Sequence, residues 1–560
     1  MIHLFPSSLE HLQEIANKQY HKDLDLAPYR GTIFDRRNIP LAISIKKSSL
    51  FINPRLFKPT SEEYRQLSEL LQMSIFKIKM IQERKNYFAW LKRKIPKETA
   101  NKITKMKIKG LFEVQEPDRV YPQGSSGAHI IGYVGLDNMG LLGLERKFDS
   151  ELRGPTIKIQ RSQDARGESI FLQSDYAVPE KTGNNLFLTV DNAIQEIAEK
   201  ALSEGIKNAN AKGGFAIVSD PHTGRIIAMA NYPKFDPNQM KKFELEPTRN
   251  RALSDTFEPG SVIKPFVIGE ALARGKIKLT DMLDCERGLF HGHSWKIRDA
   301  HPYDILSAKD VLIHSSNIGT YKIAEKLGPK KLYDALVNFG FSTKTSQIDF
   351  PGQSFGRIDP YETWKPVRFA NIAFGQGFVT TGLEIVSAYG AIANGGNLMK
   401  PYLVDHIESS ERQMIASNTS RIERRVFSPQ LAKELRIILH EVVERGTGKL
   451  ARMDQYTAAG KTGTTEKVDP LTKAYSTDKR IASFAGFTPV NDPHLVIYVV
   501  IDEPGKKPYY GGIWAAPVFK EIALGSLRYL NVAPDKAQKT GVGLTISKGE
   551  LDSPDAPVYD

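Results

Sequence analysis

Two pairs of apolar segments, placed far apart, constrain the fold of this 560-residue chain more than any other feature. The first pair, GGFAIVSD and GRIIAMANY, surrounds PHTG within residues 213–232. The second, RIASFAGFTPV and HLVIYVVIDEP, surrounds Asn491, Asp492 and Pro493. Short apolar runs joined by Gly or Pro turns predict β-hairpins. Hairpins on either side of a long helical stretch predict an α+β fold, with a central antiparallel sheet flanked by helices.

A helix is predicted directly before the first hairpin, after the predicted strand NLFLTVD. Asp191 is a favourable N-cap residue, and it precedes a segment with helical periodicity, NAIQEIAEKALSEGI. The apolar residues that recur at this spacing are Ile194, Ile197, Ala198, Ala201 and Leu202. The pattern predicts a helix from Asn192 to Ile206.

Composition limits the classes of fold and site that the chain can form. A hydrophobic fraction of 41 % gives ample material for a large core. No run of about 18 apolar residues is present, so no spanning helix or signal peptide is predicted. The single cysteine, Cys285, excludes an internal disulfide and every all-cysteine metal site. Changes in composition divide the chain into predicted domains at 1–183 and 184–530, followed by a polar, disordered tail at 531–560.

Positive charge is concentrated in one stretch. Residues 77–109 hold 12 Lys/Arg against two acidic residues, Glu83 and Glu98, in a chain whose net charge is +13. A solvated helical face is the favoured interpretation. Membrane headgroups or an acidic polymer are the alternatives. Nucleic acid is not expected as a partner, because no Gly-rich or aromatic recognition pattern accompanies the run.

The pattern Ser-x-x-Lys places a hydroxyl and an amine on one face of a helix, as serine acyl transfer requires. It occurs at Ser44, Ser74, Ser261 and Ser476. Only Ser261 follows Glu-Pro-Gly and precedes an apolar run, which predicts a helix start, so Ser261 is the candidate nucleophile. Lys264 would be its base. Its pKa must then fall from about 10.4 by roughly three units, and the helix N-terminus and a second cation would both lower it.

Lys461 is the candidate second cation. Lys-Thr-Gly occurs at Lys181, Lys461 and Lys539. The segment at Lys461 precedes the second strand pair, where an edge strand can bind an extended peptide, whereas the other two fall in a turn and in the polar tail. Ser-x-Asn, a hydroxyl to relay a proton and an amide to hold a carbonyl, occurs once, from Ser315 to Asn317.

This combination resembles the penicillin-binding proteins. The likeness extends through FEPGSVIKPF, KIRDAHPYD, HSSNIGTYKIA, AAGKTGTT and YYGGIWAAPVF. Upstream, YRGTIFDRRNIPLA and RVYPQGSSGAHIIGYVG resemble the amino-terminal pedestal of the class B, monofunctional transpeptidases. The IRD and Gly-Gln-Gly segments are more similar to the septal (FtsI/PBP3-type) branch than to the elongation branch. The resemblance implies a serine-transpeptidase (β-lactamase-like) domain preceded by an elongated mixed α/β pedestal.

The resemblance also implies a role for each site residue. Ser261 would be the acylated nucleophile and Lys264 its base, while Ser315 and Lys461 would relay a proton to the leaving amine. Asn317 would bind the substrate amide, and the backbone N–H groups of Ser261 and Thr464 would form the oxyanion hole. The substrate carboxylate would lie along Thr462, Gly463 and Thr464.

The implied function is a peptidoglycan D,D-transpeptidase of cell division. It would cross-link stem peptides that end in D-Ala-D-Ala, and β-lactam antibiotics would acylate it. No cofactor and no metal are expected. The pedestal motifs contain no second catalytic set, which implies a SEDS-type glycosyltransferase as partner, together with divisome proteins. The implied location is the outer face of the cytoplasmic membrane, with an anchoring helix absent from this chain.

Other functions remain as alternatives. A D,D-carboxypeptidase or a β-lactamase-like hydrolase would share the nucleophile and would deacylate with water, but the long pedestal disfavours both. A catalytically silent scaffold is disfavoured by the complete motif set. His291 and His293 lack an evident third metal ligand, which favours a loop or surface role. GTGK at residues 446–449 lacks the spacing of a phosphate loop and predicts a turn.

Overall fold

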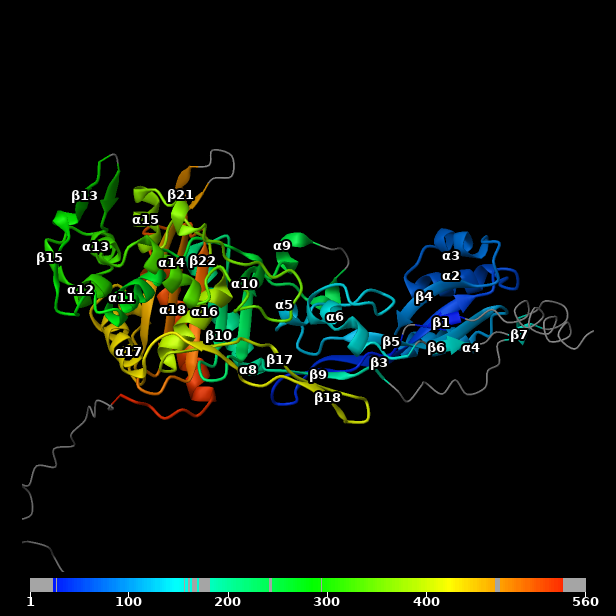
Figure 1. Ribbon diagram of the computed structural model, residues 1–560. Coiled ribbons are helices and arrows are strands. Elements are labelled where there is room, and N and C mark those ends of the chain that lie inside the picture. Colours follow the sequence, from blue (N-terminus) through cyan, green and yellow to red (C-terminus); the bar gives the residue numbers. More distant parts are fainter. Residues whose placement is uncertain are drawn as a thin grey trace, which may run out of the picture.

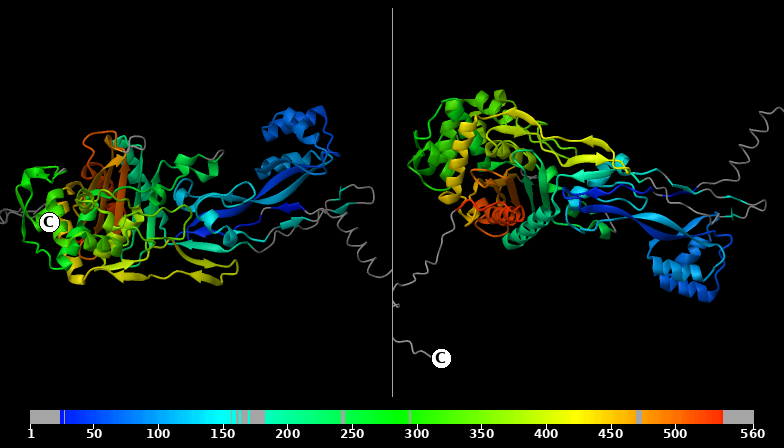
Figure 2. Two further views of the ribbon diagram at one scale, coloured as in Figure 1. Left: turned by 45° about the horizontal axis from the view of Figure 1, so that its top comes forward. Right: turned by 90° about the horizontal axis from the view of Figure 1, so that it is seen from below.

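The protein is elongated, with a sheet and its helices at one end and a narrower pedestal extending from them (Figures 1 and 2). The computed structural model describes residues 24–26, 28–155, 157–159, 162–163, 169–170, 182–240, 244–293, 295–468 and 474–536. The predicted tail beyond residue 536, which includes the Lys-Thr-Gly segment at Lys539, lies outside these residues, and so does Lys181, the first residue of another such segment.

The two predicted hairpins form one five-stranded antiparallel sheet. Its strand order is β11-β10-β22-β21-β20, so the pairing of β10 with β22 unites hairpins that are far apart in sequence. The strand that begins at Ala459 lies at the edge of the sheet. The bounds are β10 (Gly213–Ser219), β11 (Ile226–Tyr232), β20 (Ala459–Val468), β21 (Tyr475–Thr488) and β22 (Leu495–Asp502).

Helices cover both faces of this sheet. Alternate residues of β22 point to opposite faces, as the two-residue period of a strand requires. Val496, Tyr498 and Val500 pack into the core that contains α11 (Lys264–Ala273) and α16 (Gly382–Ala393). Leu495 and Ile497 pack against α8 (Asn192–Ala209) and α18 (Gly511–Tyr529). Asp191 caps α8 by accepting from the backbone N–H groups of Ala193 and Ile194, so the predicted helix is confirmed.

Further helices of this end are α12 (Ala308–His314), α13 (Asn317–Leu327), α14 (Pro329–Asn338), α15 (Pro366–Ala373) and α17 (Pro429–Glu444). They pack against α11 or, in the case of α15, against α13. Three small antiparallel pairs accompany them: β12 (Met282–Asp284) with β15 (Ile305–Ser307), β13 (Leu289–His291) with β14 (Lys296–Arg298), and β16 (Asn397–Met399) with β19 (Ile422–Arg425).

A second sheet runs from the pedestal into the larger end. Its order is β18-β17-β9-β2-β3-β4, with β5 also paired to β3. From the pedestal come β2 (Ile33–Phe34), β3 (Pro40–Ile52), β4 (Ala89–Ile95) and β5 (Leu111–Val120). From beyond residue 183 come β9 (Asn185–Leu188), β17 (Val404–Glu408) and β18 (Met414–Ser417). One continuous sheet therefore contains strands from both sides of the predicted domain boundary at residue 183.

The sequence favoured one solvated helical face for the basic stretch at residues 77–109. In the structure this stretch is not a single helix. It comprises α3 (Ile75–Gln82), β4 and α4 (Lys97–Lys105), and α2 (Ser61–Leu71) packs against both helices. Arg93 and Lys94 on β4 form ion pairs with Glu116 and Asp118. The lysines of α3 and α4 are exposed.

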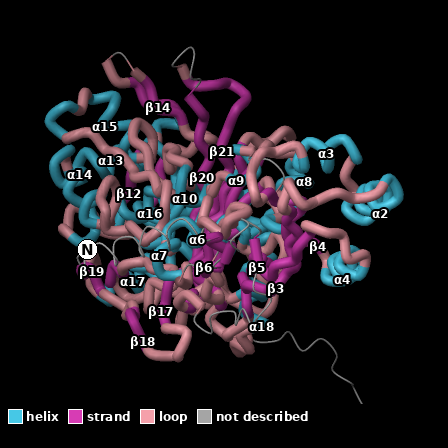
Figure 3. Tube along the Cα trace, turned by 90° about the vertical axis from the view of Figure 1, so that its right-hand side faces the viewer, coloured by secondary structure: helices cyan, strands magenta, loops and turns pink. Residues whose placement is uncertain are grey.

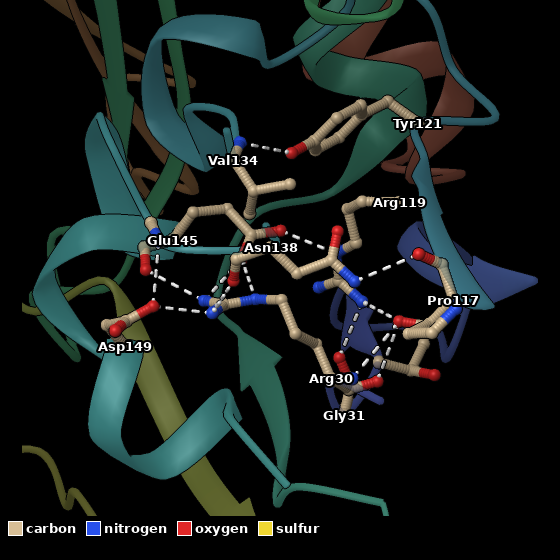
Figure 4. Close-up of polar contacts among 12 residues, drawn as sticks. Arg30, Gly31, Pro117, Arg119, Tyr121, Val134, Asn138, Glu145 and Asp149 are labelled. Atoms are coloured by element: carbon tan, nitrogen blue, oxygen red, sulfur yellow. Dashed lines mark hydrogen bonds and ion pairs between the residues drawn. The ribbon is translucent and has the colours of Figure 1, made fainter. Parts of the chain in front are cut away.

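A buried ionic network stabilises the middle of the pedestal (Figure 4). The Arg30 guanidinium lies 2.7 Å from the carboxylate of Glu145 and 2.5 Å from that of Asp149. Arg119 lies 2.6 Å from the other oxygen of Glu145 and also donates to the carbonyl of Gly31. The side chains of Arg30 and Glu145 are fully buried. The network therefore joins the chain before β2 to β5, α6 (Gly143–Lys147) and α7 (Asp149–Leu152).

Among the helices of the described residues, none combines the length and the apolar character needed to cross a bilayer.

Candidate active site

The candidate nucleophile lies in a tight turn that leads into α11. Ser261 is the second residue of a 3-10 helix, Gly260–Ile263, and Lys264 is the first residue of α11. The predicted helix start at Ser261 is therefore confirmed as a 3-10 turn, with Pro265 tolerated at the helix N-terminus. Ser261 is half-buried.

The turn is fixed by contact between two glycine backbones. Gly260 has φ +59°, a conformation that disfavours other residues, and its N–H donates to the carbonyl of Gly375 at 2.8 Å. A Cβ on Gly375 would lie 2.1 Å from the carbonyl oxygen of Gly260. The Gly-Gln-Gly segment therefore packs directly against the residue before the nucleophile.

Ser315 lies between the two candidate lysines. It ends α12 in the left-handed region, with φ +64°, which is uncommon and strained for a residue other than glycine. Its Oγ lies 2.9 Å from Nζ of Lys461 and 3.2 Å from Nζ of Lys264. The three motifs predicted to act together therefore meet at one hydroxyl.

Lys264 is completely buried. Its Nζ donates to the carbonyl of Ser315 at 2.6 Å and to Oδ1 of Asn317 at 2.7 Å. Burial lowers the pKa of Lys264 to about 7, against the opposing effect of the Asp299 carboxylate. The pKa of Lys264 is lowered by about the amount that a general base at this position was expected to need. The main cause of the shift is burial, whereas the sequence had suggested the helix N-terminus and a second cation.

Lys461 is also completely buried, and the partners of its Nζ among the described residues are Ser315 and Thr462 rather than a carboxylate. Burial lowers the pKa of Lys461 well below its usual value, and the charge of Lys264 lowers it further. Two buried ammonium groups around one hydroxyl oxygen repel each other strongly. The favoured states therefore leave at least one amine neutral, and Ser315 can pass a proton between them.

Strand β20 has one face against the nucleophile turn. Lys461 and Gly463 lie on this face, and a Cβ on Gly463 would approach Ser483 Oγ to 2.4 Å and Val262 Cγ1 to 3.0 Å. Glycine is required here because the strand packs against protein. The sequence had suggested close approach to a ligand instead.

The two threonines of the motif share the other face of β20, as the alternation along a strand predicts. Thr462 is buried, and its Oγ1 lies 2.8 Å from that of Thr447, in the GTGK turn that follows α17. Thr464 is half-buried and accepts from the N–H of Gly511, at the start of α18, at 3.1 Å.

Asp299 is a site residue that the motif search missed. It lies just after β14, and its carboxylate accepts from the backbone N–H of Asn317 and from Oγ of Ser316, each at 2.5 Å. The carbonyl of Arg298 accepts from Nδ2 of Asn317. The IRD segment therefore orients Asn317, and its similarity to the family was the one signal for it in the sequence.

Glu258, the first residue of the Glu-Pro-Gly that precedes Ser261, is a second residue that the motif search did not assign to the site. Its carboxylate accepts from the N–H of Gly377 at 2.8 Å and from the hydroxyl of Tyr475 at 3.0 Å. Burial raises the pKa of Glu258. The side chain thus links the nucleophile turn to the Gly-Gln-Gly segment and to the start of β21.

The other Ser-x-x-Lys patterns have structural roles. Ser44 lies in β3 and exchanges hydrogen bonds with the backbone of Arg30. Ser74 is the N-cap of α3 and accepts from the N–H of Lys77. Ser476 lies near the start of β21. His291 and His293 are exposed, and the described residues contain no group of three or more His, Cys, Asp or Glu that could hold a metal ion.

A half-buried serine one turn before a buried lysine, with a second serine between that lysine and another, is the arrangement of a serine acyltransferase. Residues 214–524 match the family model of the penicillin-binding protein transpeptidase domain. Residues 25–188 match that of the penicillin-binding protein dimerisation domain. The chain therefore belongs to the class B penicillin-binding proteins.

Comparison with individual proteins and solved structures supports the same family. The chain is 33 % identical to a Neisseria meningitidis serogroup A protein named probable peptidoglycan D,D-transpeptidase PenA, over 94 % of this chain and 88 % of the relative. It is 30 % identical to the peptidoglycan D,D-transpeptidase FtsI of Escherichia coli, over 90 % and 84 %. Penicillin-binding protein 3 of Mycobacterium tuberculosis, solved with aztreonam, superposes with a TM-score of 0.71 at 26 % identity, over 92 % of this chain and 99 % of that one. The predicted family, α+β fold and serine-type transpeptidase are confirmed.

Proposed function

We propose that the protein cross-links peptidoglycan through an acyl-enzyme on Ser261. Its Oγ would attack the carbonyl carbon between the two D-Ala residues of a stem peptide. The hydroxyl proton would pass to Lys264, and then through Ser315 and Lys461 to the nitrogen of the departing D-Ala. The amine of a second stem peptide would then attack the acyl-enzyme, form the cross-link and release Ser261. The observation that carries this proposal is the meeting of both buried amines at Oγ of Ser315.

The substrate contacts follow from the same geometry. Asn317 would bind the substrate amide through its carboxamide, which Lys264 and the Arg298 carbonyl orient. Backbone N–H groups of Ser261 and Thr464 would stabilise the oxyanion. Thr462, Gly463 and Thr464 would line the site of the substrate carboxylate, with Lys461 as the nearby cation. A β-lactam presents the same carboxylate beside a reactive amide, and would acylate Ser261.

The biological setting is proposed from resemblance. The IRD and Gly-Gln-Gly segments and the likeness to FtsI support a role in septum synthesis. We assign residues 1–183 to the pedestal, 184–530 to the transpeptidase domain and 531–560 to a tail. A SEDS-type glycosyltransferase and divisome proteins would be the partners at the outer face of the cytoplasmic membrane. Polymerisation of lipid II by the purified chain alone would contradict the need for a glycosyltransferase.

Intact-mass measurement after incubation with benzylpenicillin tests the nucleophile. The wild-type chain should gain the mass of one penicillin, and Ser261→Ala should gain none, while Ser476→Ala serves as the matched control that is still acylated. An adduct on Ser261→Ala would overturn the assignment.

Product analysis separates transfer from hydrolysis. With a D-Ala-D-Ala donor and an amine acceptor, a transpeptidase joins the two and releases D-Ala. A carboxypeptidase releases D-Ala without joining them, and a silent scaffold releases nothing.

A further inference from the structure

Helix α3 exposes Phe76 and Met80 most strongly among its apolar side chains, while Ile75, its first residue, is 38 % exposed. Phe76 is 73 % exposed and Met80 is 54 % exposed. They are four residues apart, and therefore adjacent on one face of the helix. Ile78 and Ile81 point the other way and are buried in the core of the pedestal. Packing of α3 against the pedestal does not account for Phe76 and Met80, because their face points outward.

Lysines border this apolar pair on both sides. At 100° per residue, Lys79 precedes Phe76 around the helix and Lys77 follows Met80, so the apolar pair lies between two cations. Both lysines are exposed, and the ammonium of Lys79 lies 5.5 Å from the ring centre of Tyr64 on α2. Arg84 and Lys85 follow the helix, and Glu83 is the one acidic residue within residues 75–85. The α3 patch, defined as Phe76, Lys77, Lys79 and Met80, is thus apolar at its centre and cationic at its edges.

We propose that the α3 patch docks on an anionic lipid surface. Phe76 and Met80 would enter the boundary between headgroups and acyl chains, while the lysine stems lie along it with their ammonium groups at lipid phosphates. Basic residues near an anionic leaflet each contribute about 1 kcal/mol, which corresponds to about fivefold in affinity. A protein partner fits less well, because protein interfaces are depleted of lysine relative to the rest of the surface, and two of the four residues of the patch are lysines. Two apolar side chains give a weak, reversible contact.

The α3 patch and the catalytic elements lie at different ends of the molecule. Helix α3 lies at the pedestal end, whereas α11, α13 and the edge strand β20 lie at the opposite end of the long axis (Figures 1 and 2). The view along that axis shows α3 at the outer side of the pedestal (Figure 3). A lipid-bound α3 would therefore place the contact with the bilayer far from the catalytic elements along the molecule (Figure 1).

Vesicle co-sedimentation of the full chain tests this proposal. Phosphatidylcholine vesicles with about one third phosphatidylglycerol should retain the protein, and pure phosphatidylcholine vesicles should retain much less. Raising the salt concentration should release it, because surface attraction is screened beyond about 10 Å at 0.1 M. Equal retention by both vesicles, or retention that does not respond to salt, would overturn the proposal.

Paired variants locate the contact. Lys77→Gln with Lys79→Gln should weaken binding on the order of twentyfold. Phe76→Ser with Met80→Ser should weaken it about tenfold or more, because the inserted apolar area is lost. The matched controls are Lys102→Gln with Lys105→Gln on α4, and Met282→Ser with Ile305→Ser on β12 and β15. Both controls remove exposed side chains of the same kinds at other places.

The controls should retain binding, and all four double variants should keep wild-type labelling by a fluorescent penicillin, which shows that they are folded. An equal loss in the α4 variant would assign the binding to overall charge and contradict the proposal. Full binding by both α3 variants would show that the patch serves something other than lipid, such as a protein.

Discussion

At the scale of single residues, the proposed catalysis depends on how two amines share one hydroxyl. Lys264 and Lys461 are both completely buried, and each lies within hydrogen-bonding distance of Ser315 Oγ. A charged lysine in water is a poor base, and burial makes the neutral form accessible near pH 7. The Asp299 carboxylate opposes this effect, so the pKa of Lys264 reflects a balance between burial and one negative charge.

This balance predicts the pH dependence of acylation. The rate by benzylpenicillin should rise about tenfold per pH unit at low pH and level off above about 7, because Lys264 acts as a base only when neutral. Asp299→Asn removes the charge that raises the pKa of Lys264, and should move the midpoint of the profile to lower pH. Stopped-flow acylation across pH measures both effects.

The control for this experiment is Asp304→Asn, which changes an exposed carboxylate paired with Arg287. It should leave the midpoint unchanged. A midpoint that rises in Asp299→Asn would contradict the electrostatic role given to Asp299.

Thr464→Val tests the proposed carboxylate site. The variant keeps the shape of the side chain and removes the hydroxyl, which should cost about 1 to 3 kcal/mol of interaction with a charged group, or roughly ten- to a hundredfold in the acylation rate. An ester analogue without the carboxylate should lose much less. Because the Thr464 hydroxyl also accepts from the N–H of Gly511, equal losses on both ligands would assign it a purely structural role.

At the scale of elements, the site depends on three segments that touch the nucleophile turn. The Gly-Gln-Gly segment contacts Gly260, strand β20 packs its Gly463 against Val262, and Glu258 connects the segment to Tyr475. The contacts of Gly375 with Gly260 and of Gly463 with Val262 involve glycines without room for a Cβ, so these two glycine positions accept little change.

Gly375→Ala should therefore abolish most of the acylation. Gly375 has φ +90°, and a Cβ there would lie 2.1 Å from the carbonyl oxygen of Gly260, so the nucleophile turn must move. Gly275→Ala is a matched control, because Gly275 follows α11 with φ +62° and a Cβ there meets no atom within 4 Å. It should cost only about 1 kcal/mol in stability, with acylation retained. The acylation rate and Tm of both variants test this prediction. Similar acylation rates in the two variants would show that the contact between Gly375 and Gly260 is dispensable.

The sequence predicted the elements better than their contacts. Apolar runs around turn residues and helical periodicity are local patterns, so the strands of both hairpins and the helix behind Asp191 could be found from neighbouring residues. The pairing of β10 with β22 is not local, and only the burial of both faces selects it. Asp299 could not be found from its own neighbourhood either, because its function depends on contacts with Ser316 and Asn317 made across a turn.

At the scale of the whole molecule, the pedestal and the catalytic end share a sheet. Strand β9 pairs in parallel with β2 and antiparallel with β17, so main-chain hydrogen bonds connect the two ends. A sheet of this kind resists bending more than a single-chain linker does. It makes the pedestal a rigid support, and the ionic network around Arg30 stabilises the segment that enters this sheet.

Glu145→Gln tests how far the support depends on that network. The substitution leaves Arg30 and Arg119 buried with one carboxylate fewer, and an unpaired buried charge costs about 3 to 5 kcal/mol. The Tm should fall clearly, whereas the acylation rate at low temperature should stay near wild type, because Ser261, Ser315 and Lys461 lie outside the pedestal.

Lys147→Gln on the same helix is the control. It removes an exposed ion pair with Asp349 and should cost no more than about 1 kcal/mol of stability. Differential scanning fluorimetry and penicillin acylation of the two variants give the comparison. Equal Tm values would show that the buried network contributes nothing to stability. A low acylation rate in Glu145→Gln well below its Tm would show instead that the pedestal influences the catalytic end directly.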